Sequence, residues 1–320
     1  MSSPKGIPSV DLSEFLSDDK ILQDKFVREI GNAYETIGFV AVKNHGISEQ
    51  MIDKLYGTMK DFFALPESIK LKYNIPGIGG QRGYTPFGQE HAKGKTAGDL
   101  KEFWHFGQFV EDNDPIEKEY PSNVFVDEIQ DLMATGKEAY RTFENTGRHL
   151  LRAIARHLNL EENYFRPHIH NGNSILRPIH YPPIVGDIEP GAVRAGEHED
   201  INLITLLVGA SADGLQVLNK NNEWVSVTEI ENHIVVNVGD MLQRLTNNKL
   251  KSTTHRVINP STENLGTSRY SVPFFLHPRS DMPLNCLSSC ITDTAPKNYE
   301  DITAGEYLLE RLREIGLVKK

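Results

Sequence analysis

The chain has 320 residues, of which 38% are hydrophobic and 24% charged, values typical of a globular protein with a sizeable core. A formal net charge of −10 argues against non-specific binding to nucleic acid or to an anionic membrane, and no apolar run is long enough to span a bilayer. Two cysteines are too few for a disulfide framework and the N-terminus does not resemble a signal peptide, so we expect a cytoplasmic protein.

The first half of the chain has mainly the pattern of helices. The expected elements, in chain order, are an extended start at residues 7–12, a helix over 17–36, a strand over 38–42, a helix capped by Ser48 that ends near Pro66, and a long helix over 123–160. Residues 77–98 are rich in glycine and predict a long loop, a kind of segment that often carries function.

The second half changes to the pattern of strands. Short apolar or alternating segments predict strands at residues 201–208, 214–218, 223–227, 233–238, 253–258 and 269–276, of which the second and third form a hairpin. We therefore expect a mainly β fold with flanking helices, whose core is a sandwich or jelly roll. The expected regions are a mainly helical one over 1–173, the β core over 174–290 and a helical C-terminal segment over 291–320.

The clearest chemical signal lies just before the strand expected at 201–208. Side chains alternate in an extended segment, so His198 and Asp200 point to one face while Glu197 and Glu199 point to the other. An imidazole and a carboxylate on one face are two-thirds of the 2-His-1-carboxylate triad that binds iron(II) in non-haem oxygenases. Taken alone, so short a motif is more often a surface or hydrogen-bonded pair.

Two later strands carry further candidate residues. His255, one of 12 histidines, lies on a predicted strand and is a candidate for the third ligand. Arg269 and Ser271 share one face of the last predicted strand, within an apolar run. A buried guanidinium requires an anion and binds a carboxylate through two hydrogen bonds, although an arginine at a strand end can instead reach solvent or a structural aspartate.

Besides these residues, the chain contains an ordered series of short motifs. They are IPSVDL from Ile7, GF from Gly38, NHG from Asn44, FFALP from Phe62, YPP from Tyr181, GDMLQ from Gly239, TN from Thr246 and SxxHRV from Ser252. With His198-x-Asp200 and Arg269-x-Ser271, this series resembles the iron(II)/2-oxoglutarate-dependent dioxygenases, and more narrowly the isopenicillin N synthase-like family. The resemblance covers nearly the whole chain.

The resemblance implies a double-stranded β-helix core, iron(II) held by His198, Asp200 and His255, and O2 as oxidant. It also implies that Arg269 and Ser271 bind the distal carboxylate of 2-oxoglutarate, with Tyr181 as a further hydrogen-bonding residue. The implied reaction oxidises a small molecule, usually by hydroxylation, and releases succinate and CO2.

The substrate is less constrained by the sequence. Arg82 and Tyr84 in the glycine-rich loop, Phe103 and His105 in an aromatic-rich stretch, and Phe275 are candidates for substrate contact. They suggest a small polar or amphipathic substrate, such as an acid held by Arg82, whereas the aromatic residues suit core packing equally well. The C-terminal helix, expected over 306–319, is a candidate to close over the site.

Two other functions are compatible with the sequence. One is an oxidase or cyclase of the isopenicillin N synthase type, which draws its electrons from the substrate and uses no 2-oxoglutarate. The other is a β-helix protein that binds a small molecule without catalysis, an alternative that the intact triad disfavours. We expect a monomer or weak homo-oligomer with no nucleic-acid or membrane partner.

Overall fold

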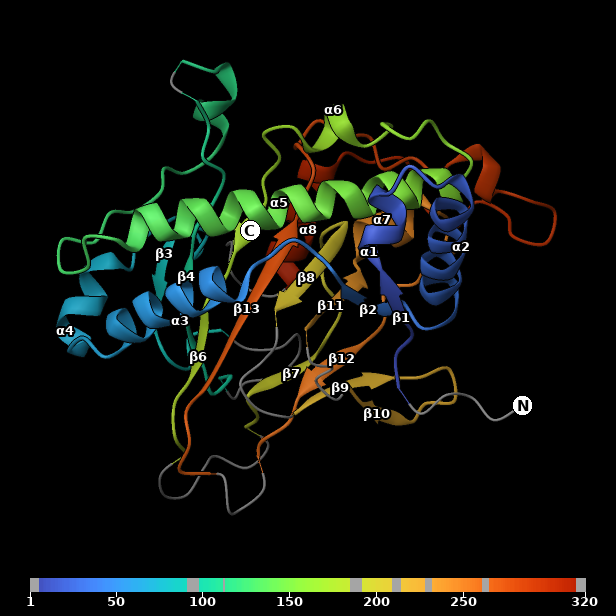
Figure 1. The fold of residues 1–320 in the computed structure, drawn as a ribbon. Coiled ribbons are helices and arrows are strands. Elements are labelled where there is room, and N and C mark those ends of the chain that lie inside the picture. Colours follow the sequence, from blue (N-terminus) through green and yellow to red (C-terminus); the bar gives the residue numbers. More distant parts are fainter. Residues whose placement is uncertain are drawn as a thin grey trace.

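The computed structural model describes residues 6–90, 98–111, 113–184, 192–208, 214–227, 232–260 and 265–314. Within these residues the strands form two sheets, and helices cover the outer face of the larger sheet (Figure 1). None of the helices in these ranges has the length and apolar character needed to cross a membrane.

The larger sheet runs in the order β1-β2-β11-β8-β13-β6-β4-β3, with β5 paired to β13. Its strands are β1 (Ser9–Asp11), β2 (Phe39–Lys43), β3 (Gly83–Thr85), β4 (Glu102–His105), β5 (Ile175–Leu176), β6 (Ile179–Tyr181), β8 (Ile204–Val208), β11 (His233–Val238) and β13 (Arg269–Leu276). Because β1 to β4 precede residue 173, this sheet extends across the boundary expected there.

The smaller sheet runs in the order β10-β9-β12-β7. Its strands are β7 (Ala195–His198), β9 (Leu215–Leu218), β10 (Trp224–Ser226) and β12 (His255–Val257). The predicted hairpin is confirmed as β9 and β10, and Asn219 Oδ1 stabilises its turn by accepting from the backbone N–H groups of Asn221 and Glu223. Buried side chains of this sheet pack against Leu207 and Val235 of the larger one, so the two sheets face each other as a double-stranded β-helix.

Helix α5 (Leu132–His157) covers the larger sheet, where it contacts β5, β8 and β13 (Figure 1). Helices α2 (Lys20–Thr36) and α3 (Glu49–Phe63) pack against α5. The remaining helical segments are α1 (Leu12–Leu16), α4 (Glu67–Lys70), α6 (Arg166–Ile169), α7 (Asp240–Leu245), α8 (Ala304–Glu314) and the 3-10 turns η1 (Leu71–Tyr73), η2 (Pro115–Glu119) and η4 (Ser288–Cys290). Each large apolar side chain buried between α5 and the sheet stabilises the fold by about 1.5–3 kcal/mol.

Several element boundaries differ from the sequence-based expectations. Helix α3 begins as predicted, because Ser48 Oγ accepts from the Met51 N–H at 3.2 Å. Helix α5 begins at Leu132 and not near 123, since the Asn123 amide is bonded to the backbone of Gly107. The glycine-rich loop contains β3, which pairs with β4, and α7 begins at Asp240, directly after the end of β11 and Gly239.

Candidate metal centre

Three side chains converge between the two sheets. His198 ends β7, Asp200 lies in the turn that follows, and His255 begins β12 directly opposite His198 in the strand pairing. Asp200 Oδ1 lies 3.8 Å from Nε2 of each histidine. Among the described residues, this is the group whose ligand atoms, all within 4.8 Å of one another, could hold one metal ion.

Neighbouring groups turn the ligand atoms of this triad inward. The Nδ1 atoms of His198 and His255 lie 2.7 Å and 3.1 Å from the backbone oxygens of Gly196 and Thr253, so each ring donates its Nδ1–H and keeps the Nε2 lone pair for a metal. Asp200 Oδ2 accepts from Thr205 Oγ1 at 2.6 Å and Asn237 Nδ2 at 2.8 Å, which leaves Oδ1 directed at the histidines. A divalent iron ion fits this donor set.

The protonation states also suit a metal. Desolvation and the neighbouring His255 lower the pKa of His198 to about 4 and keep its ring neutral, although 41% of its side chain is exposed. Burial alone would raise the pKa of Asp200, but the two histidines and the bonds from Asn237 and Thr205 hold it below its ordinary value. A carboxylate beside the neutral imidazole of His198 is suited to binding a cation.

The alternation predicted around residue 198 is visible in the side-chain contacts. Glu197 forms an ion pair with Arg256 at 3.0 Å, and Glu199 accepts a hydrogen bond from Thr254. These two pairs lie beside His255, on the opposite face of the same two strands. The neighbouring acidic residues therefore hold β7 against β12 and leave the metal to the triad.

A glycine allows close backbone approach near the third ligand. Gly38 has φ +73°, and a Cβ atom there would lie 2.1 Å from the backbone oxygen of Lys251. Thr253 Oγ1 also donates to the Ile37 backbone oxygen at 2.8 Å. The start of β2 thus fixes the segment that leads into His255, which is a physical reason for glycine in the GF motif.

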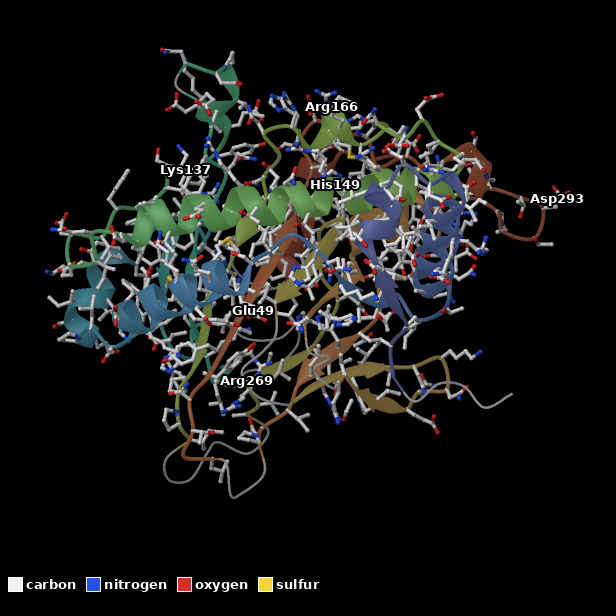
Figure 2. All side chains as sticks on the ribbon, viewed as in Figure 1. Glu49, Lys137, His149, Arg166, Arg269 and Asp293 are labelled. Atoms are coloured by element: carbon white, nitrogen blue, oxygen red, sulfur yellow. The ribbon has the colours of Figure 1, made fainter. Side chains whose placement is uncertain are left out.

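A cavity of about 80 Å³ extends from the triad between the sheets. Arg269, Ser271 and Tyr181 line it, and each is at most 3% exposed. Arg269 is paired with Tyr181 across β13 and β6, and its guanidinium carbon lies 4.8 Å from the centre of the tyrosine ring. Figure 2 shows Arg269 at the end of β13 that lies near the smaller sheet. A guanidinium and two hydroxyl groups in a buried pocket suit a carboxylate.

A second and larger cavity, of about 300 Å³, opens on the other side of the triad. His198 and Asp200 line both cavities, so the candidate metal site lies where they meet. One wall is formed by Leu308, Arg311 and Leu312 of α8. The expected C-terminal helix therefore borders the site, although its expected end, including Ile315, lies outside the described residues.

The five residues predicted to contact substrate have different positions. Phe275 and His105 line the larger cavity. Phe103 packs against Arg177, whose guanidinium carbon lies 4.3 Å from the centre of the Phe103 ring. Arg82 is fully buried beside Gly107 and donates to the Gln81 backbone oxygen, and Tyr84 donates to Glu102.

Arg82, Tyr84 and Phe103 do not line the larger cavity, whereas His105 and Phe275 do. The loop turns Gln81 toward the cavity and Arg82 into the protein interior.

The sequence reasoning missed other residues of this cavity, notably Lys101, Arg177, Asn173 and His277. Lys101 and Arg177 line both cavities. Arg177 stands in an otherwise apolar alternation with Ile175 and Ile179, the same signal that marked Arg269. His277 follows β13 directly and is 8% exposed, and burial lowers its pKa to about 4.

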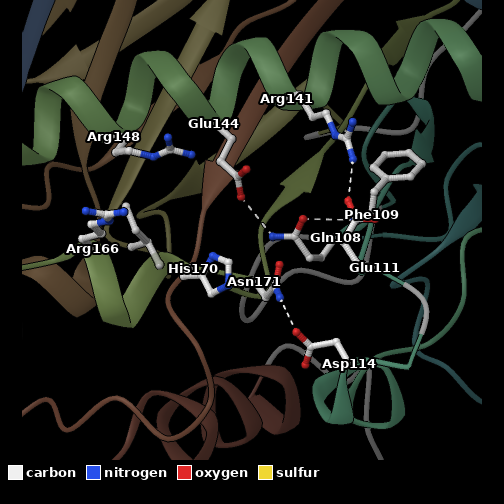
Figure 3. Close-up of a pocket in the computed structure, with 11 residues that line it drawn as sticks. Gln108, Phe109, Glu111, Asp114, Arg141, Glu144, Arg148, Arg166, His170 and Asn171 are labelled. Carbon is white, nitrogen blue, oxygen red and sulfur yellow. Dashed lines mark hydrogen bonds and ion pairs between the residues drawn. The ribbon is translucent and has the colours of Figure 1, made fainter.

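A further cavity of about 340 Å³ lies beside α5 and α6, which contribute lining residues to it (Figure 3). There Gln108 donates to Glu144 at 3.0 Å, Asn171 donates to Asp114 at 3.0 Å, and Arg141 pairs with Glu111 at 3.1 Å. Its lining residues are not among those of the two cavities at the triad. This hollow is a polar surface feature that is separate from the candidate metal centre.

Together, the β-helix fold and the inward-facing His-Asp-His group define a non-haem iron oxygenase. Residues 7–128 match the family described as "non-haem dioxygenase in morphine synthesis N-terminal", and residues 160–278 match the "2OG-Fe(II) oxygenase superfamily". A proline hydroxylase, buaE of Petromyces alliaceus, is 33% identical over 320 residues, covering 96% of this chain and 98% of the relative.

Solved structures agree with this assignment. A 2OG-Fe(II) oxygenase family protein from Caulobacter crescentus has a TM-score of 0.88 and 41% identity, covering 98% of this chain and 100% of that one. A full-length Neurospora crassa protein, solved in complex with alpha-KG (2-oxoglutarate) and thymine, has a TM-score of 0.85 and 32% identity, covering 98% of each chain. The chain belongs to the iron(II)/2-oxoglutarate-dependent dioxygenases of the isopenicillin N synthase-like superfamily. The predicted family, fold class and cofactors, which are Fe(II), 2-oxoglutarate and O2, are thereby confirmed.

Proposed function

We propose that this 2-oxoglutarate-dependent dioxygenase hydroxylates a small polar molecule in the 300 Å³ cavity beside His198 and Asp200. In this proposal His198, Asp200 and His255 hold Fe(II), and Arg269, Ser271 and Tyr181 hold the distal carboxylate of 2-oxoglutarate. When bound, the iron and 2-oxoglutarate activate O2 to oxidise a C–H bond, with succinate and CO2 as coproducts.

The observation that carries the proposal is the position of the triad between two cavities of different chemistry. The 80 Å³ cavity ends at a buried arginine, as a dicarboxylate cosubstrate requires. The larger one is lined by both charged and apolar side chains. Its volume lies at the lower end of the range of about 300–1,000 Å³ that is usual for ligand pockets, which favours a small substrate.

The residues of the chain have defined tasks in this proposal. Gly196 O and Thr253 O fix the histidine rings, while Thr205 and Asn237 fix the carboxylate of Asp200. Helix α8 contributes one wall of the larger cavity through Leu308, Arg311 and Leu312. These contacts hold the reacting groups in place before the substrate enters.

The relatives support a small substrate. The Neurospora crassa protein is solved with thymine and buaE is named a proline hydroxylase, so both point to small ring compounds with polar groups. The oxidase alternative without 2-oxoglutarate is not favoured, because the relatives are 2-oxoglutarate enzymes and Arg269 lies buried beside the triad.

The test is a screen of small polar metabolites for succinate release above the uncoupled background. Arg269→Ala should raise the apparent KM for 2-oxoglutarate about 10- to 100-fold, the loss expected for hydrogen bonds between charged groups. Arg148→Ala, at the separate surface cavity, is the matched control and should leave that KM unchanged. An Arg269→Ala enzyme with an unaltered KM would show that the cosubstrate carboxylate binds elsewhere.

A further inference from the structure

His277 is a buried residue of the proposed substrate cavity, and its Nδ1 atom has no hydrogen-bond partner among the described residues. Its side chain lines the cavity, and its Nδ1 atom is shielded from solvent without a hydrogen bond to any described residue. With 8% of its surface exposed, it belongs to the protein interior. An unsatisfied buried nitrogen costs about 1–3 kcal/mol, so such a group is usually completed by a ligand or water.

Asn173, which also lines this cavity, contains a second unsatisfied group. Its Oδ1 atom is buried and has no hydrogen-bond partner among the described residues. An amide oxygen accepts only, so the group that completes it must donate a hydrogen. The neutral imidazole of His277 has one donor and one acceptor nitrogen and can meet either kind of group.

The backbone holds these two residues side by side. The Asn173 N–H donates to the Pro278 oxygen at 3.2 Å, and the His277 N–H donates to Ser174 Oγ at 3.1 Å. A Cβ atom at Gly172 would lie 2.3 Å from the His277 backbone oxygen, so the two segments are in close contact. The pair is therefore preorganised, so the protein loses little conformational freedom there when the substrate binds.

We infer that His277 and Asn173 select the substrate by hydrogen bonding to an amide group, in which an N–H donor stands next to a C=O acceptor. The N–H bonds to Asn173 Oδ1 and the C=O accepts from His277. The substrate class is a small amide, lactam, imide or ureide. This inference rests on the proposed function, since it assigns the chemistry of the substrate in that same cavity.

The other cavity groups fit this class better than they fit a free acid. Lys101 is already paired with Glu90 at 2.7 Å and Asp99 at 2.8 Å, and the Arg177 guanidinium is engaged by Glu90 and His105. The cationic groups of Lys101 and Arg177 thus already have protein partners. A neutral amide adds hydrogen bonds where the structure lacks them and requires no further charge.

The experiment measures binding to the anaerobic enzyme loaded with Fe(II) and 2-oxoglutarate, by calorimetry. The probes are 2-piperidone, glutarimide and uracil, each compared with its fully N-methylated derivative, which lacks the N–H donor. We expect at least one parent amide to bind about 10-fold or more tightly than its N-methyl partner, the effect of one lost hydrogen bond of about 1.4 kcal/mol.

Two substitutions connect that preference to the residues. His277→Phe and Asn173→Leu should each weaken binding of the parent amide about 10-fold, while the Kd of 2-oxoglutarate stays unchanged. Asn173→Leu, at a partly exposed position, tests the inference even if His277→Phe does not fold. His170→Phe, at the exposed histidine of the separate surface cavity, is the matched control and should bind the amide as the wild type does.

Equal binding of parent and N-methylated probes, no binding of any probe, or unchanged affinity in both variants would each overturn the inference. Any of these results together with normal 2-oxoglutarate binding would leave the proposed function intact. Loss of 2-oxoglutarate binding by the wild-type enzyme would instead contradict the proposed function itself.

Discussion

At the scale of single residues, Lys101 and Glu90 show how charge is stabilised in the cavity wall. Lys101 Nζ lies between Glu90 and Asp99, and Asp99 also accepts from the Gly196 N–H at 3.2 Å. Burial would raise the pKa of Glu90, but Arg177 and Lys101 hold it well below its ordinary value. Through Gly196, whose oxygen orients His198, this network is connected to the metal centre.

The lowered pKa of Glu90 predicts a pH-dependent contribution to stability. A carboxyl group whose pKa is lower in the folded than in the unfolded state stabilises fully above the unfolded value of about 4.3, and this contribution is lost as the pH falls toward the folded value. Glu90→Gln should lower the free energy of unfolding at pH 7 by less than the ~3–5 kcal/mol that is lost when a buried charge has no partner left, because Asp99 still pairs with Lys101. The difference from wild type should shrink below about pH 4.

Urea unfolding between neutral and acidic pH measures this difference. Glu111→Gln is the matched control, because Glu111 is 82% exposed where it pairs with Arg141 and such pairs contribute about 0–1 kcal/mol. If the gap between wild type and Glu90→Gln were the same at every pH, Glu90 would not be ionised in the folded protein.

At the scale of elements, the turn between β7 and β8 positions the carboxylate ligand against α7. The Asp240 N–H, in the first turn of α7, donates to the Asp200 backbone oxygen at 2.7 Å, and the Gly239 N–H donates to the Leu203 oxygen at 2.9 Å. A Cβ atom at Gly239 would lie 2.2 Å from the backbone oxygen of Asn202. The GD pair of the sequence motif therefore allows α7 to begin directly against the segment that contains Asp200.

Gly239→Ala should accordingly move the Asp200 turn. Overpacking against backbone costs about 1–3 kcal/mol in the free energy of unfolding, and we also expect weaker Fe(II) affinity because Asn202 lies two residues from the ligand. Thermal unfolding and competitive Fe(II) titration measure the two effects. Gly57→Ala in α3, where a Cβ atom would meet nothing within 4 Å, should be neutral or stabilising by up to about 1 kcal/mol. Identical behaviour of the two variants would contradict this account of Gly239.

The features that could be predicted from the sequence are those that depend on the pattern of neighbouring residues. The alternation of side chains placed His198 with Asp200 and Arg269 with Ser271, and the strand expected at 269–276 is β13. His255 required the family resemblance, because the pairing of β7 with β12 joins distant segments and no local pattern fixes it. The short strands β3 and β4 form by pairing with each other, so neither has a clear signal of its own.

The substrate cavity was the least predictable part for the same reason. Asn173 and Arg177 flank β5, whereas His277 follows β13, and these two distant segments meet only when β5 and β6 pair with β13. Arg82 looked functional in a glycine-rich loop, yet the chain turns it into the interior. Position in sequence indicates which residues are unusual, whereas the fold decides which of them face the cavity.

At the scale of the whole molecule, two facing sheets enclose the metal centre and a helical layer stabilises the larger sheet from outside (Figure 1). In the proposed function the cosubstrate occupies the smaller cavity and the substrate the larger one, of which α8 forms one wall. The triad lies where the two cavities meet, and its two histidines come together only when β7 pairs with β12.

The most direct test of this account is an anaerobic titration of the protein with Fe(II) and then 2-oxoglutarate, followed by visible absorption. The account predicts one Fe(II) per chain and a weak metal-to-ligand absorption band that appears with 2-oxoglutarate. Asp200→Ala should lose the band while its circular dichroism stays native. A wild-type band and wild-type iron content in Asp200→Ala would contradict the assignment of His198, Asp200 and His255 as the iron site.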